Sequence, residues 1–152
     1  MELKVGDKIP NFTAKDTNGN DFDSQELIGE KPLVIYFYPK DNTPGCTVQA
    51  CSFRDQYEDF KDLGAEVIGI SSDSVLSHQK FSQQYQLPFI LLSDSDKKIR
   101  KLFGVPSGLL GILPGRVTYV ADITGTIIMV FDNMMAKRHI PKALEAIRAL
   151  KQ

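Results

Sequence analysis

The two cysteines of the chain, Cys46 and Cys51, are the residues best suited to covalent chemistry. They lie five positions apart in PKDNTPGCTVQACSFRD, residues 39–55. Thr43 can act as an N-cap and Pro44 suits the first helical position, so a helix is predicted to begin just before Cys46. The unpaired N–H groups and positive dipole end of a helix favour a thiolate. The pattern favours a reactive sulfur at Cys46 over the alternative, an inert buried cysteine.

The spacing of the two cysteines also constrains how they can react with each other. In an unbroken helix, residues i and i+5 have Cα atoms ~8.6 Å apart, from a rise of ~1.5 Å and a turn of ~100° per residue. A disulfide needs Cα atoms closer than about 7 Å. We therefore expect Cys46 and Cys51 to bond only if the first turns of the helix unwind. Spacing alone leaves open whether Cys51 does so or is a core cysteine beside Ala50.

Composition and charge exclude several classes of function. The 152 residues are predicted to form one domain, 1–152, that is long enough to bury a core. A formal net charge of −1 gives no sign of a nucleic-acid or anionic-membrane partner. No apolar run is long enough to span a bilayer, and residues 1–12 lack the apolar region of a secretory signal. We therefore expect a cytoplasmic protein.

Metal binding is not expected from the sequence. Two cysteines and two distant histidines, His78 and His139, make a poor zinc set. Both histidines are predicted to lie on the surfaces of helices, and Met134 and Met135 to serve packing. With no export signal, two cysteines fit redox chemistry better than a disulfide scaffold.

The predicted elements place Cys46 at the edge of a sheet. Residues 33–38, LVIYFY, form a continuous apolar run typical of a central strand. Residues 46–63 have helical spacing and are ended by Gly64. Further strands are predicted at 65–71, 89–92, 116–121 and 126–131, further helices at 73–85, 93–104 and 141–150, a hairpin at 11–22 that turns at Asn18 and Gly19, and a short helical turn at 23–29.

This order of elements predicts the fold class. Strands alternate with helices in the middle and hairpins lie at the ends, which favours an α/β sandwich with a mixed central sheet flanked by helices. Cys46 would lie just past the C-terminal end of the strand at 33–38, where open α/β sheets tend to place their sites.

Four motifs together resemble the peroxiredoxins, in particular their bacterioferritin-comigratory or Q-type branch. They are PKDNTPGCTVQACSFRD, GISSDSVLSHQKF, LPFILLSD and RVTYV. The pattern Pro-x-x-x-Thr-x-x-Cys, here Pro39, Thr43 and Cys46, is specific to that family. The resemblance covers nearly the whole chain and is weakest at 104–115. It implies a thioredoxin-like fold with an N-terminal hairpin, and reduction of hydroperoxides without a metal or organic cofactor.

The resemblance also assigns roles to individual residues. Cys46 matches the peroxidatic cysteine and Cys51 the resolving cysteine. Thr43 matches a threonine whose hydroxyl holds the thiolate and peroxide together, a role compatible with N-capping. Pro39 matches a proline that restricts water around the sulfur, although it equally suits a strand terminator. Arg116 matches the site arginine, a permanent cation with a fork of N–H donors.

The choice of arginine depends on the resemblance, because spacing does not select among five candidates. Arg54 ranks second, as a supporting residue near the site; its alternative is an ion pair with Glu58 one helical turn away. The others are predicted to be solvated or to lie on a basic helix face: Arg100, Arg138 and Arg148.

Two features depart from the family pattern. Gln49 stands where the family usually has glutamate, which keeps an acceptor oxygen but loses the charge. Residues 104–115, GVPSGLLGILPG, are apolar and rich in glycine. They are predicted to form a loop whose leucines pack on the core. The alternative is that Leu109 and Leu110 form an apolar wall for organic hydroperoxides, or a dimer contact.

The implied function is a thiol peroxidase of hydrogen peroxide and organic hydroperoxides. Cys46 would become a sulfenic acid, condense with Cys51, and be recycled by thioredoxin or a glutaredoxin-like donor. The protein would act as a monomer or weak homodimer. The alternatives are a thioredoxin-fold dithiol–disulfide exchanger, which generally uses a CxxC pair, and a binding module without enzymatic activity.

Overall fold

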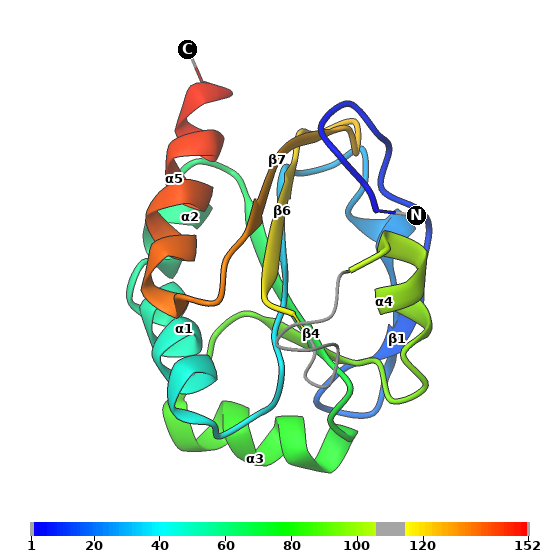
Figure 1. The fold of residues 1–152 in the computed structure, drawn as a ribbon, viewed down its shortest axis with the longest axis vertical. Helices are drawn as coiled ribbons and strands as arrows, with labels where there is room; N and C mark the ends of the chain where they lie inside the picture. The colour runs from blue at the N-terminus through cyan, green and yellow to red at the C-terminus, as the bar shows by residue number, and fades with distance from the viewer. Residues whose placement is uncertain (1, 106–114, 152) are drawn as a thin grey trace.

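A mixed β-sheet runs through the centre of the molecule and is covered on both faces (Figure 1). The computed structural model describes residues 2–105 and 115–151. Within these residues seven strands pair in the order β2-β1-β5-β4-β3-β6-β7. The strands are β1 (Thr13–Lys15), β2 (Asp21–Asp23), β3 (Leu33–Phe37), β4 (Glu66–Ser71), β5 (Ile90–Ser93), β6 (Val117–Ala121) and β7 (Ile127–Asp132). The predicted mixed α/β sandwich is confirmed.

The central strands run parallel and the outer strands antiparallel. β3 pairs with β4, and β4 with β5, in parallel. β6 pairs antiparallel with β3, with Phe37 opposite Val117, so the start of β6 lies beside the end of β3. The C-terminal ends of β3 and β4 and the N-terminal end of β6 therefore meet at one edge of the sheet, where open α/β sheets bind ligands.

The side chains of β3 point alternately to the two faces of the sheet, and each face has its own hydrophobic core. The side chains of this strand are buried throughout, and successive residues point to opposite faces. Val34 and Tyr36 belong to the cluster under the helices on one face, whereas Leu33, Ile35 and Phe37 belong to the cluster on the other. The continuous apolar run in the sequence follows from this covering of both faces.

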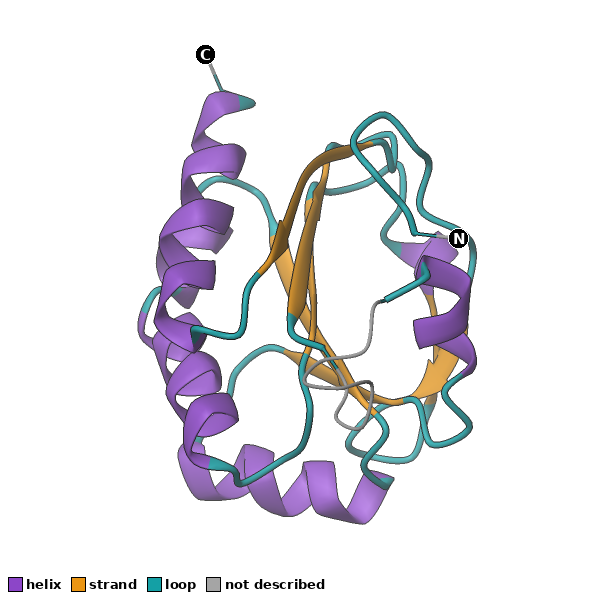
Figure 2. Cartoon of the chain, viewed as in Figure 1, coloured by secondary structure: helices purple, strands orange, loops and turns teal. Residues whose placement is uncertain are grey.

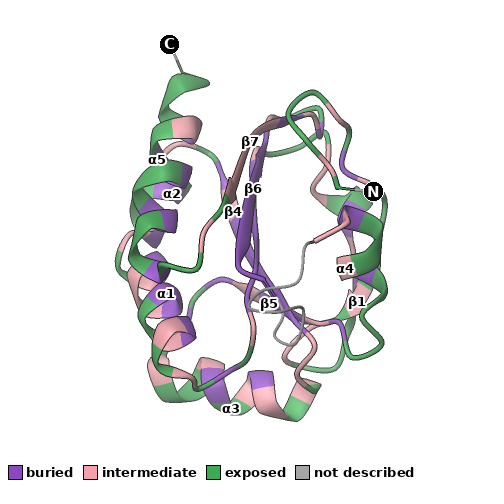
Figure 3. Cartoon of the chain, in the orientation of Figure 1, coloured by how far each residue is buried: buried purple, intermediate pink, exposed green. Residues whose placement is uncertain are grey.

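The helices divide unequally between the two faces. The helices are α1 (Pro44–Asp55), α2 (Tyr57–Asp62), α3 (Val75–Tyr85), α4 (Lys98–Phe103) and α5 (His139–Ala149), with short 3-10 turns at Ser24–Glu26 and Ala136–Arg138. Figure 2 shows α1, α2 and α5 along one side of the sheet and α4 on the other, with α3 across one end. The central strands β3, β4 and β6 are almost wholly buried, while these helices bury only their inward sides (Figure 3). No helix of residues 2–105 and 115–151 has the length and apolar character needed to cross a membrane.

Several sequence expectations need correction. The helix predicted at 46–63 is two helices, because the backbone leaves helical geometry at Gln56 (φ −103°, ψ 4°). His78 and His139 are both fully buried rather than on the surface. Met134 and Met135 are exposed, so packing does not account for them. The interpretation of Leu109 and Leu110 concerns residues outside the described part of the chain.

Candidate active site

The reactive cysteine lies at the start of α1, immediately past the sheet edge. A short loop follows β3 from Tyr38 onward, and α1 begins at Pro44. Thr43 precedes it in an extended conformation (φ −85°, ψ 153°). This local sequence brings Cys46 into the first turn of the helix, where backbone N–H groups lack helical partners and favour negative charge. The side chain of Cys46 is 1% exposed.

Arg116 brings a permanent positive charge to the sulfur. Its Nη2 lies 3.4 Å from Cys46 Sγ, and its Nη1 donates to Gln49 Oε1. Arg116 precedes β6, and the pairing of β6 with β3 carries it to the sheet edge beside α1. A guanidinium in contact with sulfur favours the thiolate by charge attraction and hydrogen bonding. The arginine chosen by the family resemblance is therefore the one that contacts Cys46.

Gly45 is the residue that makes this approach possible. A Cβ atom at position 45 would lie 2.9 Å from Arg116 Nη2, closer than non-bonded atoms normally come. The guanidinium therefore occupies space that any other residue at position 45 would fill. The sequence alone does not reveal this role, because a glycine next to a cysteine in a helical first turn carries no signal of close packing.

A pocket of about 520 Å³ opens over the site. Its walls bring together residues from the loop after β3, the segment after β4, the N-terminal side of α4 and the start of β6. They are Pro39, Lys40, Thr43, Gly45, Ser72, Asp73, Lys97 and Arg116. Three of the residues predicted for the site, Pro39, Thr43 and Arg116, thus share one pocket, and the lining residue Arg116 contacts Cys46.

Thr43 takes the predicted position but not the predicted hydrogen bond. It is the N-cap residue of α1 by backbone geometry, yet its side chain makes no capping bond. Its hydroxyl instead donates to the carbonyl of Lys40 at 2.8 Å. The side chain is therefore held within the loop that borders the pocket rather than turned into the helix.

Gln49 and Tyr36 complete the buried surroundings of the sulfur. Gln49 is fully buried and orients Arg116 through its one acceptor oxygen. Tyr36 stacks on Phe53 with ring centroids 4.7 Å apart. Burial first, and then the charge of the neighbouring Cys46, raise the pKa of Tyr36 well above its ordinary value, so that this phenol stays neutral.

Cys51 lies further along the same helix with its thiol free. It is half-buried, whereas Ala50 beside it is buried, and both cysteines are in the reduced form. Both lie within the continuous helix α1. The structure therefore shows the state in which helical spacing keeps the two sulfurs from bonding.

Arg54 does not take part in the site. Its guanidinium donates to the carbonyl of Tyr85 at 2.8 Å and pairs with Asp55 at 3.1 Å. It therefore ties the end of α1 to the end of α3. The predicted alternative partner, Glu58, is not the residue it contacts within the described structure.

A buried polar cluster beside the pocket was not predicted from the sequence. Asp41 belongs to the loop between Pro39 and Thr43, and its carboxylate contacts His78 from α3. A lone histidine in a helical pattern carries no sign of such a partner, because the two residues are 37 positions apart. The nearest signal was the presence of both residues within the motifs that resemble peroxiredoxins.

Comparisons with known proteins agree with this geometry. Residues 5–130 match the model of the AhpC/TSA family. The chain is 52% identical to chloroplastic peroxiredoxin Q of Sedum lineare, over 99% of this chain and 81% of the relative. It is 51% identical to chloroplastic peroxiredoxin Q of Suaeda salsa, over 98% of this chain and 70% of the relative. The expected cytoplasmic location is contradicted by these relatives, whose names place them in the chloroplast.

Solved structures with the same fold belong to the same group of enzymes. Peroxidoxin BcpB from Mycobacterium tuberculosis superposes with a TM-score of 0.91 at 35% identity, covering 99% of this chain and 100% of that one. A cysteine-to-serine mutant of PrxQ from Xylella fastidiosa also gives a TM-score of 0.91, at 27% identity, covering 100% of this chain and 99% of that one. The thioredoxin-like peroxiredoxin fold is thereby confirmed. With a first-turn cysteine held against an arginine and this degree of likeness, the chain belongs to the AhpC/TSA family and is a thiol peroxidase of its peroxiredoxin Q branch.

Proposed function

We propose that Cys46 is the peroxidatic cysteine, which attacks the O–O bond of a hydroperoxide. One observation carries this assignment: Cys46 Sγ lies 3.4 Å from the guanidinium of Arg116, and Arg116 lines a pocket together with Pro39 and Thr43. Arg116 stabilises the thiolate before the reaction and donates to the oxygen that develops charge during it. Thr43 aligns the peroxide, and Pro39 limits the entry of water.

The first step transfers one oxygen atom to sulfur. The Cys46 thiolate forms a bond to the nearer peroxide oxygen, and the O–O bond breaks. The leaving alkoxide or hydroxide takes up a proton to give an alcohol or water, and Cys46 becomes a sulfenic acid. Sulfur is oxidised by two electrons and the peroxide is reduced by two, so no resident metal or organic cofactor is required.

Cys51 is proposed to resolve the sulfenic acid. Its thiol attacks the Cys46 sulfur, an intrachain disulfide forms, and water leaves. Because both residues lie in α1, the first turns of the helix must unwind for the two sulfurs to meet. The half-buried position of Cys51 supports this role, since local unwinding exposes it without opening the core.

The cycle closes when an external dithiol reduces the disulfide. We propose thioredoxin or a glutaredoxin-like protein as the donor, which becomes oxidised as Cys46 and Cys51 return to thiols. The catalytic unit is proposed to be one domain, residues 1–152, acting as a monomer or weak homodimer. Disulfide exchange without peroxide is disfavoured, because a dithiol exchanger needs a pair that closes without unfolding.

Intact mass spectrometry after one equivalent of hydrogen peroxide tests this assignment. The wild type is expected to lose the mass of two hydrogens, as a disulfide forms. Cys51→Ser is expected to gain the mass of one oxygen, as the sulfenic acid is trapped. Cys46→Ser is the control and is expected neither to change mass nor to consume peroxide in the presence of thioredoxin and its reductase. Peroxide consumption by Cys46→Ser at the wild-type rate would refute the role of Cys46.

A further inference from the structure

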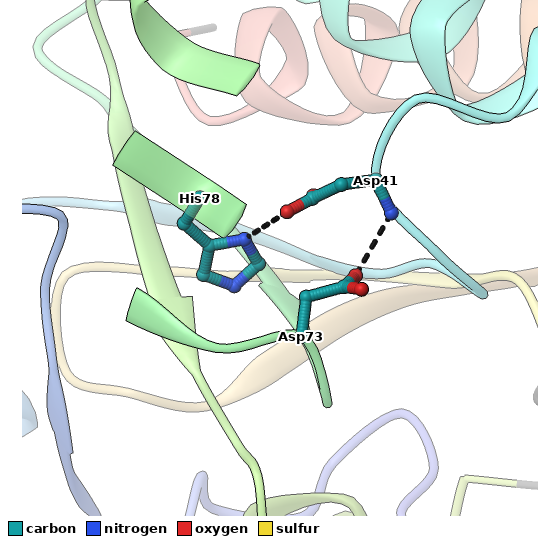
Figure 4. A group of neighbouring side chains, drawn as sticks. All are labelled: Asp41, Asp73 and His78. Carbon is teal, nitrogen blue, oxygen red and sulfur yellow. Dashed lines mark hydrogen bonds and ion pairs between the residues drawn. The ribbon is translucent and has the colours of Figure 1, made fainter. Parts of the chain in front are cut away.

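A buried polar cluster lies behind the loop that borders the pocket (Figure 4). His78, on α3, is 0% exposed, and Asp41, in the loop, is 5% exposed. Their side chains meet with His78 Nδ1 2.6 Å from Asp41 Oδ2. The backbone N–H of Asp41 donates to Oδ2 of Asp73 at 2.8 Å, and Asp73 follows β4. Asp41 therefore joins the loop to the segment after β4 and to α3, which lie 32 and 37 positions later in the sequence.

The partners of His78 fix how many protons the cluster holds. Its Nε2 lies 2.9 Å from the carbonyl oxygen of Leu92, which can only accept, so Nε2 carries a proton. Its Nδ1 faces a carboxylate oxygen of Asp41, so a second proton lies between those two atoms. Asp41 and His78 together therefore hold two protons and carry no net charge. An ordinary neutral imidazole has one ring nitrogen without a proton, whereas here each ring nitrogen takes part in a hydrogen bond that contains one.

The other neighbours of Asp41 place that second proton on the histidine. Tyr38 donates its hydroxyl to Asp41 Oδ1 at 2.6 Å, and Ser77 donates to Oδ2 at 2.9 Å. Donors on both oxygens favour the ionised carboxylate. Burial, and then the charge of Asp41, raise the pKa of Tyr38 well above its usual value, so Tyr38 keeps the proton that it donates. The cluster is thus a buried imidazolium–carboxylate pair with its hydrogen-bonding groups engaged.

This pair holds the loop through a residue that does not line the pocket. Asp41 is buried, whereas Pro39, Lys40 and Thr43 line the pocket. The next residue, Asn42, has a φ of +61°, in the left-handed region, which a surrounding structure must hold in place. The carbonyl of Lys40 in turn accepts the hydroxyl of Thr43. Any movement of Asp41 therefore moves the neighbours that line the pocket.

We propose that the Asp41–His78 pair is a positioning device for the peroxide reaction, which sets the loop at 39–43 and with it Thr43 and the start of α1. The inference rests on the proposed role of Cys46. Removing either partner leaves the other buried without its hydrogen-bond partner and releases the loop. Since misplacement of a catalytic group by 1 Å can cost on the order of 10²-fold in rate, the peroxide step is the one that suffers.

The same atoms could in principle bind a metal ion, but their existing bonds argue against it. Asp41, Asp73 and His78 place ligand atoms within 4.8 Å of one another. A metal would need the lone pair of His78 Nδ1, which instead carries the proton shared with Asp41. Asp73 Oδ2 already accepts from Ser71 at 2.6 Å as well as from Asp41. The cluster is therefore assigned to hydrogen bonding.

Ring nitrogen-15 NMR of the reduced protein at pH 7 tests the charge state. His78 is expected to show two protonated nitrogens. His139 serves as the reference in the same spectrum: its Nε2 lies 2.6 Å from the carbonyl of Asn133, and burial lowers its pKa to about 4, so it is expected to show one protonated nitrogen. A bare nitrogen on His78 at pH 7 overturns the proposal.

Kinetics of variants test the positioning role. His78→Gln and Asp41→Ala are expected to lower the rate at which peroxide oxidises Cys46 by roughly 10- to 100-fold, while alkylation of Cys46 by iodoacetamide changes by less than about threefold. Alkylation needs the thiolate but not the aligned peroxide. Asp41→Asn is expected to restore most of the peroxide rate, because its amide can donate to a neutral His78. Unchanged peroxide rates, or equal losses in both reactions, refute the proposal.

A matched pair of tyrosine variants covers the case in which loss of His78 prevents folding. Tyr38→Phe removes one hydroxyl that donates to Asp41, and Tyr57→Phe removes one that donates to Glu66 at 2.7 Å. Only Tyr38→Phe is expected to slow the peroxide step, and equal rates in both variants contradict the proposal. If Cys46→Ser still consumes peroxide, the proposed function fails instead, whatever the NMR of His78 shows.

Discussion

At the scale of single residues, the site depends on how closely a guanidinium can approach a sulfur. Arg116 reaches Cys46 because position 45 has no side chain. Two residues that are adjacent in sequence thus serve the same contact, since Cys46 supplies the nucleophile and Gly45 supplies the space for its cation. The helix itself tolerates a side chain at position 45, where alanine is preferred over glycine by up to about 1 kcal/mol.

Gly45→Ala is therefore expected to separate activity from stability. Its Cβ would lie 2.9 Å from Arg116 Nη2, so the guanidinium must shift. We expect the rate of Cys46 oxidation by hydrogen peroxide, measured by stopped flow, to fall about 10-fold or more, while thermal stability stays the same or rises. Val48→Ala is the control, because Val48 lies on the exposed side of the same helix. An unchanged rate in Gly45→Ala would mean that the contact is dispensable.

The residues of the site differ in how visible they were in the sequence. Cys46 and Pro44 were visible because helix-start chemistry is local. Arg116 was identified only through the family resemblance, since its contact with Cys46 spans 70 positions and depends on the pairing of β6 with β3. His78 was predicted on the surface because its partner is also distant in sequence. Helical spacing shows which side of α3 a residue occupies, but it does not show that Asp41 from another segment contacts that residue.

At the scale of elements, the two roles of α1 need different conformations of the same helix. As a helix it presents Cys46 to its N-terminal N–H groups and to Arg116. As proposed, it must also unwind so that Cys51 can reach Cys46. The break at Gln56 ends α1 before α2 begins, so the segment that carries both cysteines is a separate helix rather than part of a longer one. The sequence did not show this break, because neither glycine nor proline marks it.

Hydrogen exchange should reveal this unwinding on oxidation. In the reduced protein the amide of Thr47 donates to the carbonyl of Thr43 at 2.9 Å, and the helix continues through Asp55. After formation of the disulfide, amides from Cys46 to Cys51 are expected to exchange at least about 10-fold faster, because the bond cannot form across an intact helix. Amides of α5 are the internal control and should not change. Retained protection of α1 in the disulfide form would rule out the switch.

At the scale of the whole molecule, the sheet and its two cores followed from pattern alone. Continuous apolar runs at β3 and β4 predicted central strands, and glycines such as Gly19 and Gly104, both with positive φ, marked the turns and helix ends that the structure contains. What pattern could not supply was the interior polar chemistry. His78 and His139 are both fully buried polar rings, each satisfied by partners that folding alone brings together.

His139 shows how such a residue makes overall stability depend on pH. Its Nδ1 accepts from Thr118 at 2.7 Å and its Nε2 donates to the carbonyl of Asn133, so the folded protein holds the neutral ring. Burial first, and then the charge of Arg116, lower the pKa of His139 from 6.5 to about 4. Below pH 6.5 the unfolded chain binds this proton and the folded protein does not. The free energy of unfolding from His139 is thus fully present above pH 6.5 and is lost as the pH falls toward 4.

Urea unfolding of the wild type and His139→Gln at pH 5 and pH 7 measures this contribution. Between these pH values the wild type is expected to lose about 2 kcal/mol more of its free energy of unfolding than the variant, since the unfolded histidine titrates over about 1.5 pH units of that range. Every other titrating group, including the Asp41–His78 pair, is common to the two proteins and cancels in the comparison. Equal losses in both proteins would mean that folding does not lower the pKa of His139. His139 contacts Thr118, two residues after Arg116, so a charged ring there would also repel the guanidinium that contacts Cys46.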